Sequence, residues 1–403
     1  MFLDSFFLIC SRGSLAVSGL LFWCLAARLY SVEEIGYGAA LISFSSLLIF
    51  ISSLGIVPTF IKFIPQEKNK ARLLITFFFF SSAVLALFYF IFLLSAVLFF
   101  PKILLLKNTL YSILFFFFVL SMLIYQGLEG VYIALKSTPM VLVNNIIQNF
   151  LRLLFLFVLV VFSGFGIFAS NCLAAMAAIL VTAVYLMKKY PNSRLTFNVD
   201  QAVFKKLFNF SFVNFLSSIP LLLPGMVFPL LIVIFYSGRE AGLFYIPWMI
   251  FSVYCSLITS VSSVFLMKAS YGQDIKNLLK KTLFLSFGLG ALGFFIFMFL
   301  AEPILLIFKK DFSLNSPVFL RLLFCSIFFF IVNQIYTTIL NIRHQVKSLA
   351  GFAAIIILSL LVFVFILMPK LGINGIGLAW LVSNFIGNIY ICWVLFVQKQ
   401  KLW

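Results

Sequence analysis

The polar side chains best suited to binding chemistry lie together on one apolar segment, 142–162. They are Asn144, Asn145, Gln148, Asn149 and Arg152. On an α-helix, which turns about 100° per residue, these side chains fall within an arc of about 140°. Amides offer donors and acceptors to hydroxyl groups, and a forked guanidinium suits a diphosphate. The pattern predicts the wall of a substrate cavity; the alternative is a polar seam between helices in which Arg152 pairs with Glu129.

Four further ionisable side chains in or at the ends of apolar segments have two interpretations each. Arg12 either adds a second cation to the cavity or extends to lipid headgroups. Glu129 is either a counter-ion for one of the arginines or a carboxylate that couples transport to protons. Lys62 and Lys268 end their segments, where they either lie at the membrane interface or form paired gates at the cytoplasmic mouth of the cavity.

Polar side chains recur in the second half of the chain without a nearby charge. They are Asn333, Gln334, Asn341, Asn384 and Asn388, at helical spacing. Such amides suit a cavity wall and helix–helix packing equally well. Glu302, followed by Pro303, has no visible partner in the sequence, and we expect it at the membrane interface.

The sequence contains no cluster of residues for metal or nucleophilic chemistry. His344 is the single histidine, the six cysteines stand singly in apolar segments, and no GxxxxGK[ST] motif occurs. Isolated cysteines in such segments are typical of small buried apolar residues. We therefore expect no metal site, no cofactor, no ATP hydrolysis by this chain and no enzymatic activity.

The composition indicates the element type that must position these residues. Of 403 residues, 64% are hydrophobic and 9% are charged, whereas soluble domains carry about 25% charged residues. A membrane-crossing helix needs ~20 apolar residues, so the chain is predicted to be an all-α polytopic membrane protein. The net charge of +18 does not indicate nucleic acid as a partner, because the cations lie in short loops between apolar segments.

Twelve apolar segments are predicted to be transmembrane helices. They span 5–27, 38–61, 73–100, 110–133, 142–162, 167–187, 207–236, 241–267, 282–308, 318–340, 348–369 and 373–397. The polar stretch 188–206 is predicted to be a linker between a lobe of six helices at 1–187 and a second at 207–403. Eighteen Lys and Arg lie in the loops on the side of this linker and eight on the other side, which places both termini in the cytoplasm.

The two halves share residues at a constant shift of 206. Tyr30-Ser31 matches Tyr236-Ser237, Glu34 matches Glu240, Lys62 matches Lys268, Thr76 matches Thr282, and Gly166-Ile167 matches Gly372-Ile373. Because each half has an even number of helices, the repeat is predicted to be parallel, with a pseudo-twofold axis along the membrane normal. Two lobes that face a central cavity are the expected architecture.

Several of these segments resemble one family along nearly the whole chain. The segment 28–63 has an acidic pair, a glycine, a serine-rich helix and then Leu-Gly-Ile; SGREAGLFYIPWMIFSV at 237–253, FKKDFSLNSPVFLRLL at 308–323 and LGINGIGLAWLVSNFIGNIY at 371–390 add to the likeness. The chain resembles the O-antigen and polysaccharide flippases of the multidrug/oligosaccharidyl-lipid/polysaccharide exporter superfamily, which share a MATE-like fold.

The resemblance implies transfer of an undecaprenyl-diphosphate-linked oligosaccharide from the cytoplasmic to the periplasmic leaflet of a bacterial inner membrane. It also implies membrane lipid, a polysaccharide polymerase and chain-length machinery as partners. A multidrug exporter of the same fold is one alternative, although organic cations favour acidic cavities. A membrane O-antigen polymerase is the other, although its chemistry needs a large outer loop and the outer loops here are short.

Overall fold

The structure is helical and consists of membrane-length elements. The computed structural model describes residues 2–53, 60, 64, 70–99, 108–135, 137–189, 225–270, 274–343 and 345–397. In this part of the chain nine helices are long and apolar enough to cross a membrane, or ten if one bent pair forms a single span. No β-strand occurs among these residues. The prediction of an all-α, multi-pass membrane protein is confirmed.

The predicted number of twelve spans is matched in part. The segment 5–27 is helical, but its described apolar part, Val17–Leu29, is shorter than a span. The segment 207–236 lies mostly outside the described residues, and only Gly225–Phe235 of it is seen as a helix. The remaining ten predicted segments each correspond to a membrane-length helix or to the bent pair.

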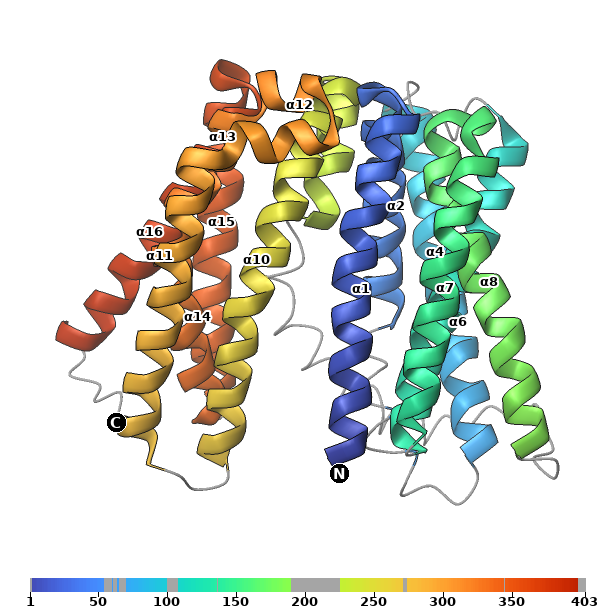
Figure 1. The fold of residues 1–403 in the computed structure, drawn as a ribbon, viewed down its shortest axis with the longest axis horizontal. Coiled ribbons are helices and arrows are strands. Elements are labelled where there is room, and N and C mark those ends of the chain that lie inside the picture. The colour runs from blue at the N-terminus through green and yellow to red at the C-terminus, as the bar shows by residue number, and fades with distance from the viewer. Residues whose placement is uncertain are drawn as a thin grey trace. The chain divides into compact units, whose positions relative to one another are not determined.

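The chain divides into two compact units, Met1–Ser218 with Leu223–Ala241 and Ile219–Leu222 with Gly242–Trp403. Helices α1 to α8 belong to the first unit, as Figure 1 shows in blue to green. Their bounds are α1 (Phe2–Leu29), α2 (Val32–Ser53), α4 (Lys70–Phe99), α6 (Thr109–Ala134), α7 (Thr138–Val158), the 3₁₀ turn η1 (Val160–Phe162) and α8 (Ser163–Lys189). The predicted linker 188–206 lies almost entirely outside the described residues, so the lobe boundaries remain a prediction.

The second unit contains most of α10 and the helices that follow it. Their bounds are α10 (Gly238–Ser270), α11 (Ile275–Phe308), α12 (Lys310–Asn315), α13 (Pro317–Cys325), α14 (Ile327–Ile342), α15 (Val346–Leu371) and α16 (Ile373–Val397). In Figure 1 the short helices α12 and α13 lie together at one end of this unit. The prediction of a single helix over 318–340 is wrong, because the chain bends by 43° between α13 and α14.

Aromatic side chains form a large part of the core of each unit. In the first unit Phe44, Phe115 and Phe168 are buried and their rings stack in sequence, with centroids 5.6 and 4.9 Å apart. In the second unit Phe251 of α10 packs edge-on against Phe324 of α13, with centroids 5.4 Å apart. Such ring pairs add about 0.5–1.5 kcal/mol beyond the area that they bury. Part of the abundant phenylalanine is therefore used for packing between helices, while other phenylalanines are exposed on the outside of the units.

The repeated motif at the shift of 206 caps two helices. Glu34 N donates to Ser31 Oγ at 3.2 Å and Ser31 N donates to Glu34 Oε2 at 2.8 Å, which forms a capping box at the start of α2. Glu240 N donates to Ser237 Oγ at 3.2 Å at the start of α10. The cap explains why α2 begins at Val32, six residues before the predicted start.

The last matched pair of the repeat is displaced by three residues. Ser163, the first residue of α8, and Gly372, which precedes α16, both have positive φ values, 50° and 58°. Three residues later, a Cβ on Gly166 or on Gly375 would meet a main-chain carbonyl of the preceding turn or helix. The structural equivalent of Gly166 is therefore Gly375, at a shift of 209, and the sequence match to Gly372 is wrong.

Candidate functional site

The polar residues of 142–162 lie on α7, which packs chiefly against α1 and α8. Proline in the first turn and Ser137 at the N-cap position begin the helix. The four amide residues are buried, with 4–5% of each exposed: Asn144, Asn145, Gln148 and Asn149. The opposite side of the helix exposes large apolar residues such as Ile146, Phe150 and Leu154. The predicted amphipathic division of this helix is confirmed.

Two of the amides on α7 are bonded to neighbouring helices. Asn144 Oδ1 accepts from Thr182 Oγ1 of α8 at 2.9 Å. Asn145 Oδ1 accepts from the Tyr125 hydroxyl of α6 at 2.6 Å. These bonds make part of the polar face an interhelical seam, as the alternative interpretation expected.

Asn149 differs from the other two amides. Both polar atoms of its side chain, Oδ1 and Nδ2, are buried and have no hydrogen-bond partner among the described residues. Leaving a buried polar group unpaired costs about 1–3 kcal/mol, so this amide is suited to a partner from outside the chain, either water or substrate. It lies one turn from Asn145 and about one turn from Arg152 on the same face.

Arg152 is positioned by α1. Its Nη2 donates to Ser18 Oγ at 2.8 Å, and its guanidinium carbon lies 5.3 Å from the centroid of the Phe22 ring. Phe22 is 1% exposed, so the ring beneath the guanidinium is fixed by packing. A cation over an aromatic face contributes about 0.5–2 kcal/mol. The cation is therefore held at a defined place beside the amides of α7.

Glu129 lies on α6, one turn after Tyr125, and is half-buried. The Tyr125 hydroxyl lies within the electrostatic influence of both Glu129 and Arg152. Because this hydroxyl also donates to Asn145, it joins the carboxylate, the guanidinium and the amides in one polar group. We call Tyr125, Glu129, Asn145, Asn149 and Arg152 the α7 site.

The three other predicted cations of the site are Arg12, Lys62 and Lys268. The backbone of Arg12 lies in α1, but its side chain is outside the described residues, and so is the whole of Lys62. Lys268 is exposed in the last turn of α10. The paired gate of Lys62 and Lys268 therefore remains a prediction.

The asparagines of the second half bond mainly to one another. Asn333 Nδ2 on α14 donates to Asn384 Oδ1 on α16 at 3.1 Å, and Asn388 Nδ2 donates to Asn333 Oδ1 at 3.1 Å. A Cβ on Gly387 would lie 2.8 Å from Asn333 Oδ1, so the amide fills the space that this glycine leaves. These residues join α14 to α16, as the packing alternative expected.

Glu302 has a partner that the sequence did not show. Its Oε1 lies 3.0 Å from Arg321 Nη2, and Arg321 Nε donates to the Met298 carbonyl at 3.1 Å. Because both side chains are at least one-third exposed, the pair contributes about 1 kcal/mol or less. It links α11 to α13 and lies outside the α7 site.

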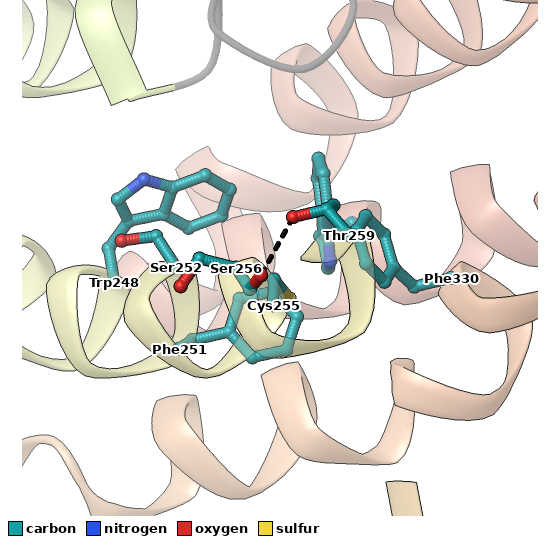
Figure 2. Close-up of a pocket in the computed structure, with 8 residues that line it drawn as sticks. Trp248, Phe251, Ser252, Cys255, Ser256, Thr259 and Phe330 are labelled. Carbon is teal, nitrogen blue, oxygen red and sulfur yellow. Dashed lines mark hydrogen bonds between the residues drawn. The ribbon is translucent and has the colours of Figure 1, made fainter. Parts of the chain in front are cut away.

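A second polar feature lies within the second unit, in a pocket on α10 of about 200 Å³. Figure 2 shows Ser252, Ser256 and Thr259 along the helix, between Trp248 and Phe330. Trp380 of α16 also lines the pocket. We call these six residues the aromatic pocket. No cluster of three metal-ligating side chains occurs in the described parts of either unit.

The comparisons with known proteins agree with this architecture. No family model matches the chain. A capsular polysaccharide biosynthesis protein of Staphylococcus aureus, CapF, is 24% identical in an alignment 284 positions long, which covers 64% of this chain and 68% of the relative. An inward-facing MATE family multidrug resistance transporter of the MOP superfamily has a TM-score of 0.71 at 13% identity, over 93% of this chain and 96% of its own. The chain has a MATE-like fold.

The lipid II flippase MurJ, in an inward closed conformation, shares the MATE-like fold. Its TM-score is 0.70 at 20% identity, over 98% of this chain and 87% of its own. Together with the capsular polysaccharide relative, these similarities confirm the resemblance to polysaccharide flippases and MATE-like exporters that the sequence predicted.

Within the MATE-like fold, sequence reasoning missed the aromatic pocket. A signal was present, because Trp248, Ser252, Ser256 and Thr259 follow each other at intervals of three or four residues and therefore share one helix face. Trp380 and Phe330, which complete the pocket, come from helices 71 or more residues further along the chain. No local pattern could predict that contribution.

Proposed function

We propose that this protein is a flippase for an undecaprenyl-diphosphate-linked oligosaccharide, an O-antigen or related polysaccharide repeat unit. It moves this substrate from the cytoplasmic to the periplasmic leaflet of the bacterial inner membrane by alternating access of its two units, without enzymatic activity. The fold shared with a lipid II flippase and the similarity to a capsular polysaccharide biosynthesis protein support the proposal.

The observation that carries the proposal is the placement of Arg152. A guanidinium inside a membrane-length apolar helix costs at least ~2.5 kcal/mol against lipid, and here it is held in place by Ser18 and Phe22. A diphosphate is the anionic part of the proposed substrate, and a close ion pair at an effective dielectric near 20 contributes about 4 kcal/mol before desolvation. The forked guanidinium can hold two phosphate oxygens at once.

The amides of α7 are proposed to contact the first sugar of the substrate. Asn149 supplies a donor and an acceptor that are buried and unpaired in the described structure, and Asn145 and Gln148 lie within one turn of it. Hydroxyl groups of a sugar can satisfy both kinds of atom. Arg12 is proposed as a second contact for the diphosphate.

The remaining predicted residues are proposed to control access. Lys62 and Lys268, at equivalent places in the repeat, are proposed as paired gates, and Glu129 as a structural or coupling carboxylate. We also propose that both termini and the 188–206 linker lie in the cytoplasm, between six-helix lobes at 1–187 and 207–403. The polysaccharide polymerase and the chain-length machinery are the proposed protein partners.

A multidrug exporter is the second candidate function. The observation in its favour is the TM-score of 0.71 to a multidrug resistance MATE transporter. Organic cations favour acidic side chains in a cavity, whereas the α7 site combines one carboxylate with a guanidinium and several amides. The α7 site therefore has no excess of acidic side chains to attract an organic cation, and its guanidinium can contact a phosphate.

Transport by the purified chain in proteoliposomes separates the two candidates. One set of vesicles carries a fluorescent undecaprenyl-diphosphate oligosaccharide, whose movement between leaflets is followed by the accessibility of the label to a quencher. A matched set is loaded with ethidium. We expect protein-dependent movement of the lipid-linked sugar and none of ethidium; the opposite result would contradict the proposed function and support an exporter.

A further inference from the structure

The aromatic pocket lies in the second unit and shares no residue with the α7 site. Its lining combines aromatic rings with hydroxyl groups. Its walls are indole and phenyl rings, and its remaining polar groups are hydroxyls of α10. Ser252 and Ser256 are exposed, so the pocket is open at the surface of this unit. None of its lining residues is a carboxylate or a cation, so the pocket is suited to a neutral group.

The hydroxyls of α10 are available as hydrogen-bond acceptors. Ser252 Oγ donates to the Met249 carbonyl at 2.9 Å, Ser256 Oγ to the Val253 carbonyl at 2.6 Å, and Thr259 Oγ1 to the Ser256 carbonyl at 2.9 Å (dashed in Figure 2). A hydroxyl has one donor and two acceptor lone pairs. Because each donor is used within the helix, the row offers acceptor lone pairs to a ligand that carries O–H or N–H groups.

Trp380 adds a donor. The residue is 5% exposed, and its indole Nε1 is buried with no hydrogen-bond partner in the described part of the chain. Its ring packs edge-on against Trp248, with centroids 5.1 Å apart and planes at 86°, and Trp248 in turn stacks on Phe244. The ring is thus held in place, and a ligand oxygen that reached its N–H would satisfy a donor that now lacks a partner.

The size of the pocket limits the ligand. Its volume of about 200 Å³ is smaller than the roughly 300–1,000 Å³ of pockets for drug-sized ligands, which suits one ring and not a whole oligosaccharide. A pyranose ring has apolar C–H faces that suit aromatic walls and hydroxyl groups at its edges that donate and accept hydrogen bonds.

We propose that the aromatic pocket is a sugar subsite that holds one neutral pyranose ring of the transported oligosaccharide. This inference rests on the proposed function, since it assigns to the second unit the part of the substrate that carries no charge. The second unit then contributes selectivity for the sugar.

The test is saturation-transfer NMR on the full-length protein in nanodiscs, with the methyl glycosides of glucose, galactose, mannose and N-acetylglucosamine as probes. We expect transfer from protein aromatic protons to the ring C–H protons of at least one glycoside. Trp380→Phe keeps one aromatic ring and removes the pyrrole ring with its N–H donor, so the affinity for that glycoside should fall about five- to tenfold. Ser256→Ala, which removes one acceptor, should weaken binding about threefold.

Matched controls are available for both variants. Ser260→Ala removes a hydroxyl that is exposed on the next turn of α10 and bonds to a carbonyl of the same helix in the same way, but lies outside the pocket. Trp393→Phe removes an exposed indole of α16. Both controls should retain wild-type affinity. Because Trp380→Phe also removes buried ring volume, the affinity of this variant is measured at a temperature at which thermal unfolding shows it to be fully folded.

Three results would overturn the subsite. They are the absence of saturation transfer to all four glycosides, equal binding by Trp380→Phe, Ser256→Ala and the controls, and displacement of the glycoside by tetraethylammonium at lower concentration than by free sugar. The last would indicate an aromatic site for organic cations. Pocket-dependent sugar binding in a protein that fails to flip the lipid-linked substrate would support the subsite and contradict the proposed function.

Discussion

Asn145 and Asn149 lie one turn apart on α7 and differ in their hydrogen bonding. Asn145 accepts from the Tyr125 hydroxyl, whereas both polar atoms of Asn149 are without a partner in the described structure. Replacing Asn145 by leucine removes the acceptor of a buried hydroxyl, and we expect a loss of about 1–3 kcal/mol in stability. Replacing Asn149 by leucine removes an unpaired group, so stability should be unchanged or higher while flipping falls.

Thermal unfolding by size-exclusion chromatography and the vesicle assay measure the two effects on the same samples. Equal destabilisation by the two leucine variants would show that Asn149 is a structural amide. A fully active Asn149→Leu variant would remove this residue from the substrate site. Tyr125→Phe is the matched control for the bond to Asn145, because it removes the donor and keeps the ring.

The sequence predicted the polar face of α7 because helical spacing alone places its members together. It did not predict which of them would be paired. Tyr125, Thr182, Ser18 and Phe22 come from three other helices, and the choice among several equally spaced amides depends on how those helices pack. Similarly, the partner of Glu302 is Arg321, which lies 19 residues further along the chain on α13. The turn that brings the two side chains together was not evident from the hydrophobicity pattern.

At the scale of elements, Gly166 and Gly375 allow the backbones of α8 and α16 to pack closely against the segments that precede them. A Cβ at Gly166 or Gly375 would meet a main-chain carbonyl, which cannot move aside as a side chain can. We expect Gly166→Ala and Gly375→Ala each to lower stability by about 1–3 kcal/mol. Gly351→Ala on α15 is the matched control, because nothing lies within 4 Å of its Cβ.

Melting temperatures of the purified alanine variants test this prediction. The two tight positions should unfold at lower temperature than wild type, and the Gly351 variant should be equal or higher, since alanine favours helix over glycine by up to ~1 kcal/mol. If all three variants melted together, the close approach of these backbones would not be a determinant of the fold.

The length of the apolar segments predicts most of the helices and their order along the chain, but it does not predict several of the positions at which helices begin or end. The start of α2 was readable in the pattern Ser31-x-x-Glu34, which is a capping box. The break between α13 and α14 at Ser326 was not, because the sequence stays apolar across it. The hydroxyl of Ser326 bonds to the Leu323 carbonyl at 2.6 Å, a local bond that competes with helix geometry and is common at bends.

At the scale of the whole molecule, the distribution of loop cations predicts the orientation. Eighteen cations on one side against eight on the other predict that both termini lie in the cytoplasm. A fusion of alkaline phosphatase, which is active only in the periplasm, to Trp403 should therefore be inactive, and a fusion of a cytoplasmic fluorescent protein should be bright. An active phosphatase at Trp403 would show an odd number of spans or the reverse orientation.

The all-α class and the MATE-like fold could be predicted from the sequence. The apolar composition indicates membrane-spanning helices, and patterns of glycine, serine and acidic residues carry the family resemblance. The number of spans could not be predicted equally well, because two of the twelve segments are interrupted. The predicted segment 207–236 contains Pro220, Pro224 and Pro229, and the chain bends at Ser326. Such interrupted helices depend on neighbouring elements to satisfy their backbone groups. Apolar length does not carry that information.

Binding of the diphosphate of a lipid-linked sugar by Arg152 is tested most directly by measuring transport by Arg152 variants. The variants are Arg152→Ala, Arg152→Lys and the double variant Arg152→Ala with Glu129→Ala. All are compared at equal amounts of folded protein in the vesicle assay with the undecaprenyl-diphosphate oligosaccharide.

If Arg152 binds the diphosphate, Arg152→Ala should lose at least tenfold in flipping, and the double variant should not recover it. Arg152→Lys should keep partial activity, because it retains the charge and loses the fork. A structural pair would behave differently, because removing Glu129 as well would relieve an uncompensated charge. Restored flipping by the double variant would contradict a role of Arg152 in binding the diphosphate.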